Sequence, residues 1–78
     1  MTTVLITGAG TGFGREVALR LAAEGFDVIA GVEIVAQVYE LSEEARSRNV
    51  TLQVEKLDVT HEGDRQKAEE WDVDILLN

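Results

Sequence analysis

The sequence contains no cysteine and no proline, and it has a single histidine. Without cysteine there can be no disulfide framework and no thiolate metal site, and a reducing cytoplasm is the default compartment. With only one histidine in addition, the composition indicates no metal site. Because proline is absent, no segment is barred from a helix or a sheet on that ground.

Long hydrophobic runs and basic residues are also scarce. No apolar segment approaches the roughly 18 residues needed to cross a bilayer, and the opening residues, MTTVLITG, have no charged leader or cleavage site. We therefore expect no membrane partner, no export and a cytoplasmic location. Seven basic against 15 acidic residues give a net charge of −8, which repels phosphate backbones and argues against nucleic acid as a partner.

What is present is typical of one small globular domain over residues 1–78, with 45% apolar and 28% charged residues. The pattern predicts strands separated by helices. The first helix is expected to end at Gly25, because a left-handed residue, usually glycine, commonly closes a helix. The predicted strands fall at residues 3–7, 27–31, 50–57 and 74–77, and helical spacing begins near Phe13, Ile34 and His61.

Strands that alternate with helices predict an α/β fold in which right-handed crossovers connect a parallel sheet. The partial alternation of the third strand predicts an edge position. The expected buried stripe of the first helix consists of Phe13, Val17, Ala18, Leu21 and Ala22, and that of the second consists of Ile34, Val35, Val38, Leu41 and Ala45.

Four glycines crowd the corner between the first strand and the first helix: Gly8, Gly10, Gly12 and Gly14. A helix N-terminus offers unpaired N–H groups and about half a positive charge, which suits a pyrophosphate. Glycine permits the tight turn, the close approach of phosphates and close packing of helix on strand. A structural turn without a ligand is the alternative.

The residues after the glycines narrow the choice of ligand. A Walker loop needs a lysine followed by serine or threonine, whereas Arg15 and Glu16 follow Gly14, which disfavours a nucleoside triphosphate. The strict G-x-G-x-x-G spacing also fails, because its sixth position falls on Phe13 or on Arg15. What remains is Thr7-Gly8-x-x-x-Gly12-x-Gly14 on a strand-to-helix corner.

This spacing resembles the TGxxxGxG cofactor motif of the short-chain dehydrogenase/reductase family. The segment Leu57-Asp58-Val59-Thr60 is similar to the one after that family's third strand, whose aspartate contacts the adenine ring. The segment VDILLN, residues 73–78, resembles the fourth strand leading into the family's NNAG motif, with Asn78 as its first residue. The resemblance covers the whole chain and about the first third of a family member.

The resemblance implies a partial Rossmann fold, with a parallel sheet of about four strands in the order 3-2-1-4. It also implies hydride transfer between a nicotinamide cofactor and an alcohol or carbonyl substrate in the intact protein. The implied cofactor-binding residues are Gly8, Gly10, Thr11, Gly12, Phe13, Gly14, Gly31, Glu33, Asp58, Val59 and Asn78.

The end of the second strand bears on the choice between NAD and NADP. By resemblance, the family's usual acidic position is Gly31, and the basic residue of NADP-preferring members would fall at Thr11 or Val32. Neither can pair with a 2′-phosphate, and Glu33 would repel one, so we expect NAD rather than NADP. Arg15, one residue past the motif, is expected to be solvated rather than a phosphate partner.

The family's catalytic Tyr-x-x-x-Lys pair is missing. The one tyrosine, Tyr39, is followed four residues later by Glu43, and its neighbours predict a packing role. Ser42 and Ser47 lie among charges, and His61 is expected at the surface. We therefore expect no catalytic residue in this chain and no activity of the chain alone.

The last apolar run, DILL, would form an uncovered edge strand. Such an edge invites pairing, so we expect a homo-oligomer formed through it. Two interpretations stay open. The chain is either the cofactor-binding start of a short-chain oxidoreductase, or a standalone half-Rossmann binding or scaffold module that self-associates through its last strand.

Overall fold

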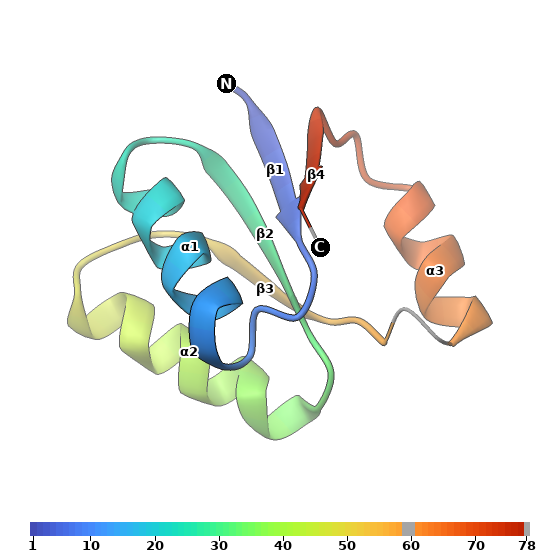
Figure 1. The fold of residues 1–78 in the computed structure, drawn as a ribbon, viewed down its shortest axis with the longest axis horizontal. Helices are drawn as coiled ribbons and strands as arrows, with labels where there is room; N and C mark the ends of the chain where they lie inside the picture. Colours follow the sequence, from blue (N-terminus) through green and yellow to red (C-terminus); the bar gives the residue numbers. More distant parts are fainter. Residues whose placement is uncertain (59–60, 78) are drawn as a thin grey trace.

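The computed structural model describes residues 1–58 and 61–77 of the chain. In this part strands and helices alternate from the first residues to the last (Figure 1). The strands are β1 (Thr3–Ile6), β2 (Asp27–Val32), β3 (Gln53–Lys56) and β4 (Ile75–Leu77), and the helices are α1 (Gly12–Ala23), α2 (Val35–Ser47) and α3 (Glu62–Glu69). All strand pairs are parallel, and the order β3-β2-β1-β4 confirms the predicted one.

β1 lies inside the sheet, with β2 on one side and β4 on the other. Leu5 of β1 pairs with Ile29 of β2 and with Leu76 of β4. The predicted edge position of β3 is confirmed, but β3 is shorter than the predicted 50–57. The reason is that the Val50 N–H donates to the Ala45 carbonyl at 2.8 Å, so residue 50 closes α2 instead of extending the sheet.

The helices α1 and α2 end in the same way. Gly25 (φ 100°) and Asn49 (φ 58°) are left-handed, which confirms the predicted cap at Gly25 and adds one that the sequence analysis did not name. After each of them the next N–H reaches back five residues, from Phe26 to the Leu21 carbonyl at 3.1 Å and from Val50 to that of Ala45. This is the Schellman arrangement, which satisfies carbonyls that a helix end leaves unpaired.

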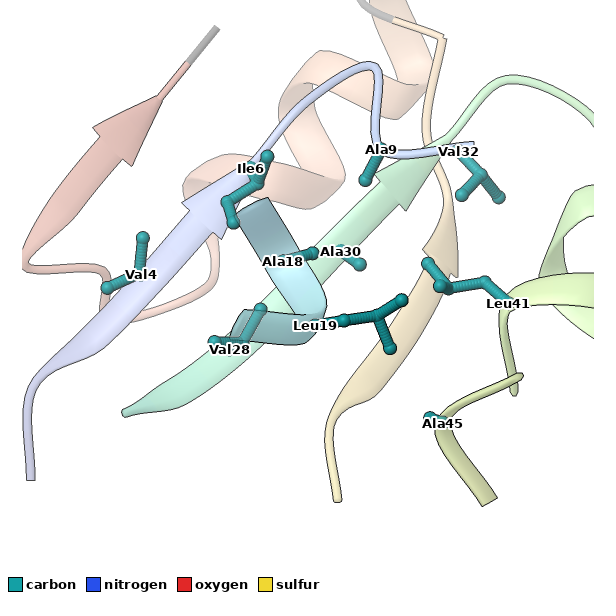
Figure 2. Close-up of a cluster of buried hydrophobic side chains, with 10 residues drawn as sticks. All are labelled: Val4, Ile6, Ala9, Ala18, Leu19, Val28, Ala30, Val32, Leu41 and Ala45. Carbon is teal, nitrogen blue, oxygen red and sulfur yellow. The ribbon is translucent and has the colours of Figure 1, made fainter. Parts of the chain in front are cut away.

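The larger part of the core lies between the sheet and the helices α1 and α2. Figure 2 shows the side chains of both helices directed at the strands. Leu19 of α1 and Leu41 of α2, each 1% exposed, are among its largest side chains. The remaining members are Val4, Ile6, Ala9, Ala18, Val28, Ala30, Val32 and Ala45.

The opposite face of the sheet carries a smaller core. Leu5, Ile29 and Leu57 are buried there, and Ala68, Trp71 and Val73 pack against them from α3 and the segment that follows it. Successive residues of β1 therefore serve different faces, as expected for a strand buried between two helical layers.

Four residues predicted to pack in the core are exposed instead: Phe13, Ile34, Val35 and Tyr39. Phe13 is 85% exposed, because it belongs to the first turn of α1, and Leu19, absent from the predicted stripe, is buried. Tyr39 is 71% exposed, so the predicted packing role is wrong. In α2 the buried residues Leu41 and Ala45 lie in the second half of the helix, and Ile34 and Val35 at its start are exposed.

Candidate functional site

The turn between β1 and α1 depends on two left-handed glycines. Gly8 has φ 66° and Gly12 has φ 58°, values that side chains rarely adopt. A Cβ built on either would meet no atom within 4 Å. The outer side of the turn is therefore open, and glycine is needed there for the backbone conformation.

Gly14 has a different role in the same turn. A Cβ on Gly14 would lie 2.5 Å from the Gly8 carbonyl oxygen, so only glycine lets α1 pack this closely on the turn. The buried Ala9 fixes the turn to the neighbouring strand, because its N–H donates to the Gly31 carbonyl at 2.9 Å. Gly31 itself leaves little room for a side chain, since a Cβ there would lie 3.0 Å from Leu57 Cδ2, which would have to shift.

The N-terminus of α1 opens at this turn. The first N–H groups of any helix lack partners within the helix, and together they carry a partial positive charge. Thr11, at the N-cap, makes no side-chain cap hydrogen bond, and the first turn of α1 contains no acidic residue. These features, together with the open side of Gly8 and Gly12, suit an anionic group.

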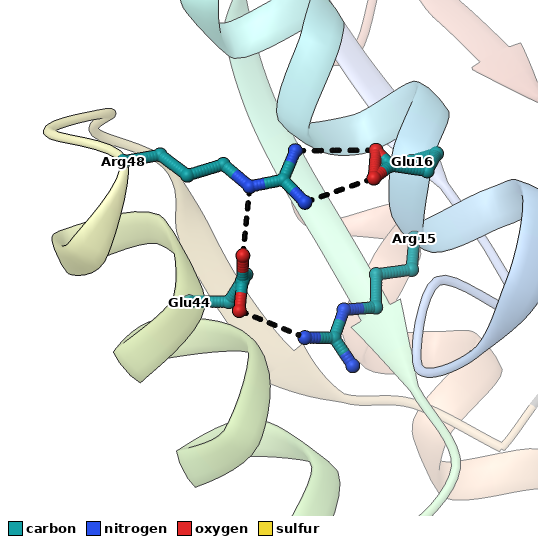
Figure 3. A network of polar contacts seen from close by, with 4 residues as sticks. All are labelled: Arg15, Glu16, Glu44 and Arg48. Atoms are coloured by element: carbon teal, nitrogen blue, oxygen red, sulfur yellow. Dashed lines mark hydrogen bonds and ion pairs between the residues drawn. The ribbon is translucent and has the colours of Figure 1, made fainter.

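The cation nearest in sequence, Arg15, is partly exposed and forms an ion pair. Its Nη2 lies 3.3 Å from Glu44 Oε1 of α2, and its side chain is 32% exposed, so it is paired with a carboxylate as well as partly solvated. Glu44 also binds Arg48, which forms a two-bond pair with Glu16 of α1 (Figure 3). The hydrogen bond from Arg48 lowers the pKa of Glu16, and the Glu16 carboxylate raises the pKa of Arg48. This network joins α1 to α2.

Two hollows flank the glycine turn. The polar one has a volume of about 120 Å³ and lies toward the end of β2; it is lined by Gly8, Gly10, Thr11, Glu33 and Gln37. The apolar one has a volume of about 410 Å³ and lies between α1 and the ends of β1 and β4; it is lined by Ile6, Thr7, Gly8, Phe13, Gly14, Val17 and Leu77.

The predicted site residues are thus partly brought together. Thr11 and Glu33, distant in sequence, share the polar hollow, and Phe13 and Gly14 share the apolar one. Sequence reasoning missed Gln37, whose amide lies against Gly10. The signal for it was its place as the third helical residue of α2, where glutamine is a common capping residue.

Asp58 follows β3 and lines neither hollow. Its N–H donates to Asp64 Oδ2 at 2.8 Å, and Lys56 Nζ lies 2.9 Å from the same oxygen. Asp64, in the first turn of α3, therefore connects the end of β3 to that helix. Val59 and Asn78, predicted to bind cofactor, lie outside the described residues.

The bonds of Asp64 should make the stability of this connection depend on pH. The Asp58 N–H, followed by Lys56, lowers the pKa of Asp64 below its ordinary value of 3.8. Because the pKa is lowered in the folded state, the bonds to the Asp64 carboxylate contribute their full stability above pH 3.8, and this contribution is lost as the pH falls through the folded-state pKa.

We expect Asp64→Asn to lower the melting temperature at neutral pH, and we expect this effect to disappear in acid. A series of thermal unfolding measurements at different pH values tests it. Asp72→Asn, on an exposed residue, is the control; an equal loss at every pH would contradict the prediction.

No group of three or more histidine, aspartate or glutamate side chains in residues 1–58 and 61–77 could hold a metal ion. In the same part of the chain, none of the helices has the length and apolar character to span a membrane. The candidate site consists of the glycine turn, the start of α1 and the ends of β1, β2 and β4.

Comparison with known proteins adds to this geometry. The sequence model of the short chain dehydrogenase family matches residues 2–77. The chain belongs to the short-chain dehydrogenase family. An uncharacterised oxidoreductase of Myxococcus xanthus is 43% identical over 58 residues, and these cover 74% of this chain and 23% of that protein. Mouse retinol dehydrogenase 5 is 37% identical over 68 residues, 87% of this chain and 20% of that protein.

Solved structures of short-chain dehydrogenases share the fold. A short-chain dehydrogenase from Sphingobium yanoikuyae in complex with NADPH has a TM-score of 0.80 and 29% identity, over 97% of this chain and 32% of that one. The partial Rossmann fold predicted from the sequence is thereby confirmed. The chain spans about a quarter of the length of the curated relatives it matches. The family match favours a part of a short-chain oxidoreductase over a standalone or scaffold module.

Proposed function

We propose that this chain is the NAD-binding part of a short-chain oxidoreductase. The observation that carries the proposal is the position of the glycine turn. It follows β1, the strand from which the chain goes to β2 on one side and later returns to β4 on the other. In open parallel sheets, ligands bind outside the carboxyl ends of the strands at such a reversal of strand order.

The residues at this point fit a pyrophosphate. Gly8 and Gly12 leave the turn open, and the N-terminus of α1 supplies N–H groups and a positive dipole without an acidic residue in its first turn. This local field acts against a net charge of −8. We assign the pyrophosphate to the turn from Gly8 to Gly14, including Gly10, Thr11, Gly12 and Phe13.

The other cofactor assignments follow from the family motif. We assign the adenosine ribose to the end of β2, with Gly31 and Glu33, and the adenine ring to Asp58 and Val59. Asn78 is assigned to the cofactor site as the first residue of the segment that resembles the family's NNAG motif. These five positions are proposals that rest on their match to the motifs of the family.

We propose that the reaction also needs residues that this chain does not contain. A bound nicotinamide cofactor supplies hydride exchange with an alcohol or carbonyl group. The described residues bind and orient it, while Tyr39, the one tyrosine, is exposed on α2 with Glu43 four residues later. We therefore propose that the chain alone does not turn over a substrate.

Glu33 supports NAD over NADP. It lines the polar hollow beside Thr11, and the described residues that line this hollow include no cation. A 2′-phosphate placed there would meet a carboxylate without a compensating charge. Some similar structures are complexes with NADPH, so the proposed preference depends on the side chain that this chain has at position 33.

Calorimetric titration with NADH and with NADPH tests the proposal. We expect the chain to bind NADH more tightly. Glu33→Gln should reduce the difference between the affinities for NADH and NADPH. It should improve NADPH binding about fivefold to tenfold, as expected when one like-charge contact is removed. Glu40→Gln, on an exposed residue of α2 that lines neither hollow, is the control. No binding of either dinucleotide by the folded chain would refute the function.

Self-association through β4 stays a prediction. The feature on which it rests is present, because Ile75, Leu76 and Leu77 are 43%, 57% and 38% exposed at the edge of the sheet. Light scattering over a range of concentrations tests it, and a monomer mass throughout would exclude it.

A further inference from the structure

Gly10 is the one glycine of the turn that the family-like spacing does not require. It stands at a variable position of Thr7-Gly8-x-x-x-Gly12-x-Gly14. It is buried, and it is absent from the glycines with positive φ, which are Gly8, Gly12 and Gly25. Backbone conformation therefore does not explain a glycine at position 10.

The Gln37 side chain occupies the space that a side chain at position 10 would need. A Cβ on Gly10 would overlap the Gln37 amide, at 2.5 Å from Cδ and 2.8 Å from Nε2. No backbone atom is among its three nearest neighbours. Glycine at position 10 thus matches one particular side chain, that of Gln37 on α2.

The same amide holds the backbone at the end of β2. Gln37 Oε1 accepts from the Glu33 N–H at 3.2 Å and from the Ile34 N–H at 3.4 Å. Ile34 is the N-cap residue of α2, and its side chain has no polar atom with which to cap the helix. Gln37 supplies that cap from the third helical position, and so fixes the segment that carries Glu33.

We propose that Gly10 and Gln37 are a matched pair of positioning residues that set the selectivity of the polar hollow. The pair joins the glycine turn to the β2–α2 connection, and it holds Glu33 at the hollow opposite Thr11. The neutral amide leaves Glu33 as the only charge among the described lining residues, which suits an adenosine ribose without a 2′-phosphate. This inference rests on the proposed function.

A double-mutant cycle tests the pair. Gly10→Ala pushes the amide out, and Gln37→Ala removes it, so each should weaken NADH binding about fivefold to tenfold, the size of a lost orienting hydrogen bond. In the Gln37→Ala background the space is empty, and Gly10→Ala should have no further effect. Gln66→Ala, on an exposed residue of α3, is the control. A full effect of Gly10→Ala in both backgrounds would overturn the pairing.

Gln37→Glu separates positioning from simple helix capping. The carboxylate keeps the acceptor for the N–H groups of Glu33 and Ile34 but adds a negative charge at the hollow. We expect an unchanged melting temperature and a ratio of NADH to NADPH affinity raised about fivefold to tenfold, the effect of one added like charge. An unchanged ratio would overturn the role in selectivity.

The two proposals fail in different ways. Binding of NADH that none of these variants alters would refute the pair and leave the proposed function standing. Absence of NADH binding by the folded wild-type chain would refute the proposed function and the selectivity with it. In that case the coupling between positions 10 and 37 is still decided by the amide NMR shift of Glu33, which Gly10→Ala should move only when Gln37 is present.

Discussion

Gly14→Ala should abolish measurable dinucleotide binding. The added methyl group would lie 2.5 Å from the Gly8 carbonyl oxygen, a backbone atom that cannot turn aside as a side chain can. The start of α1 must therefore move away from the turn, and the N–H groups assigned to the pyrophosphate move with it. We expect a loss of about a hundredfold or more in NADH affinity, comparable to the effect of misplacing a binding group by about 1 Å. Calorimetric titration measures it.

Gly63→Ala is the matched control. Gly63 lies in the first turn of α3, as Gly14 does in α1, but a Cβ there would meet the exposed His61 ring at 3.3 Å. That side chain can give way, and alanine is the better helix former by about 1 kcal/mol. Gly63→Ala should leave NADH binding unchanged and keep or raise the melting temperature. Equal losses of NADH affinity in both variants would mean that a general effect on helices is responsible, and not the close contact of Gly14 with the Gly8 carbonyl.

Leu19→Ala should remove a large fraction of the free energy of unfolding of the chain. Leu19 is 1% exposed and is among the largest fully buried side chains. Truncation of such a residue costs about 2–5 kcal/mol. A chain of 78 residues has only several kcal/mol of stability, at roughly 0.05–0.15 kcal/mol per residue. Urea unfolding followed by circular dichroism measures the loss.

Leu76→Ala is the control for this truncation. Leu76 is 57% exposed on β4, so removal of its side chain leaves no closed cavity. We expect its effect on the free energy of unfolding to be a small fraction of that at Leu19. A similar cost at both positions would show that the face between α1 and the sheet is not the main source of stability.

The order of elements could be predicted because its signals are local and repeated, whereas the strand order 3-2-1-4 was implied only by the resemblance to the family. Apolar runs separated by helical spacing gave the strands, and Gly25 gave the end of α1. The predictions that Phe13 is buried and that Tyr39 packs against the core were wrong. Periodicity identifies the apolar face of a helix, but it does not show which turns of the helix overlie the sheet. The ion pair of Arg15 was not predicted, because its partner, Glu44, lies 29 residues away on another helix.

The site was predictable only in the part that backbone geometry defines. Gly8, Gly12 and Gly14 have a spacing that a strand-to-helix corner requires, and their roles in the structure agree with it. The role of Gly10 could not be read from the turn alone, because it depends on Gln37, which reaches the turn from α2. Long-range pairs of this kind leave no periodic trace in a single sequence.

The inner position of β1 has a consequence for synthesis. One edge of β1 pairs with β2, but the other pairs with β4, and Thr3 donates to Asp74, 71 residues later. At roughly 5–20 residues per second, a ribosome needs several seconds to synthesise these residues. Throughout this interval Leu5 and Ile6 of the nascent chain belong to a strand with one unpaired edge. β1 can therefore gain its second neighbour only after β4 has left the exit tunnel.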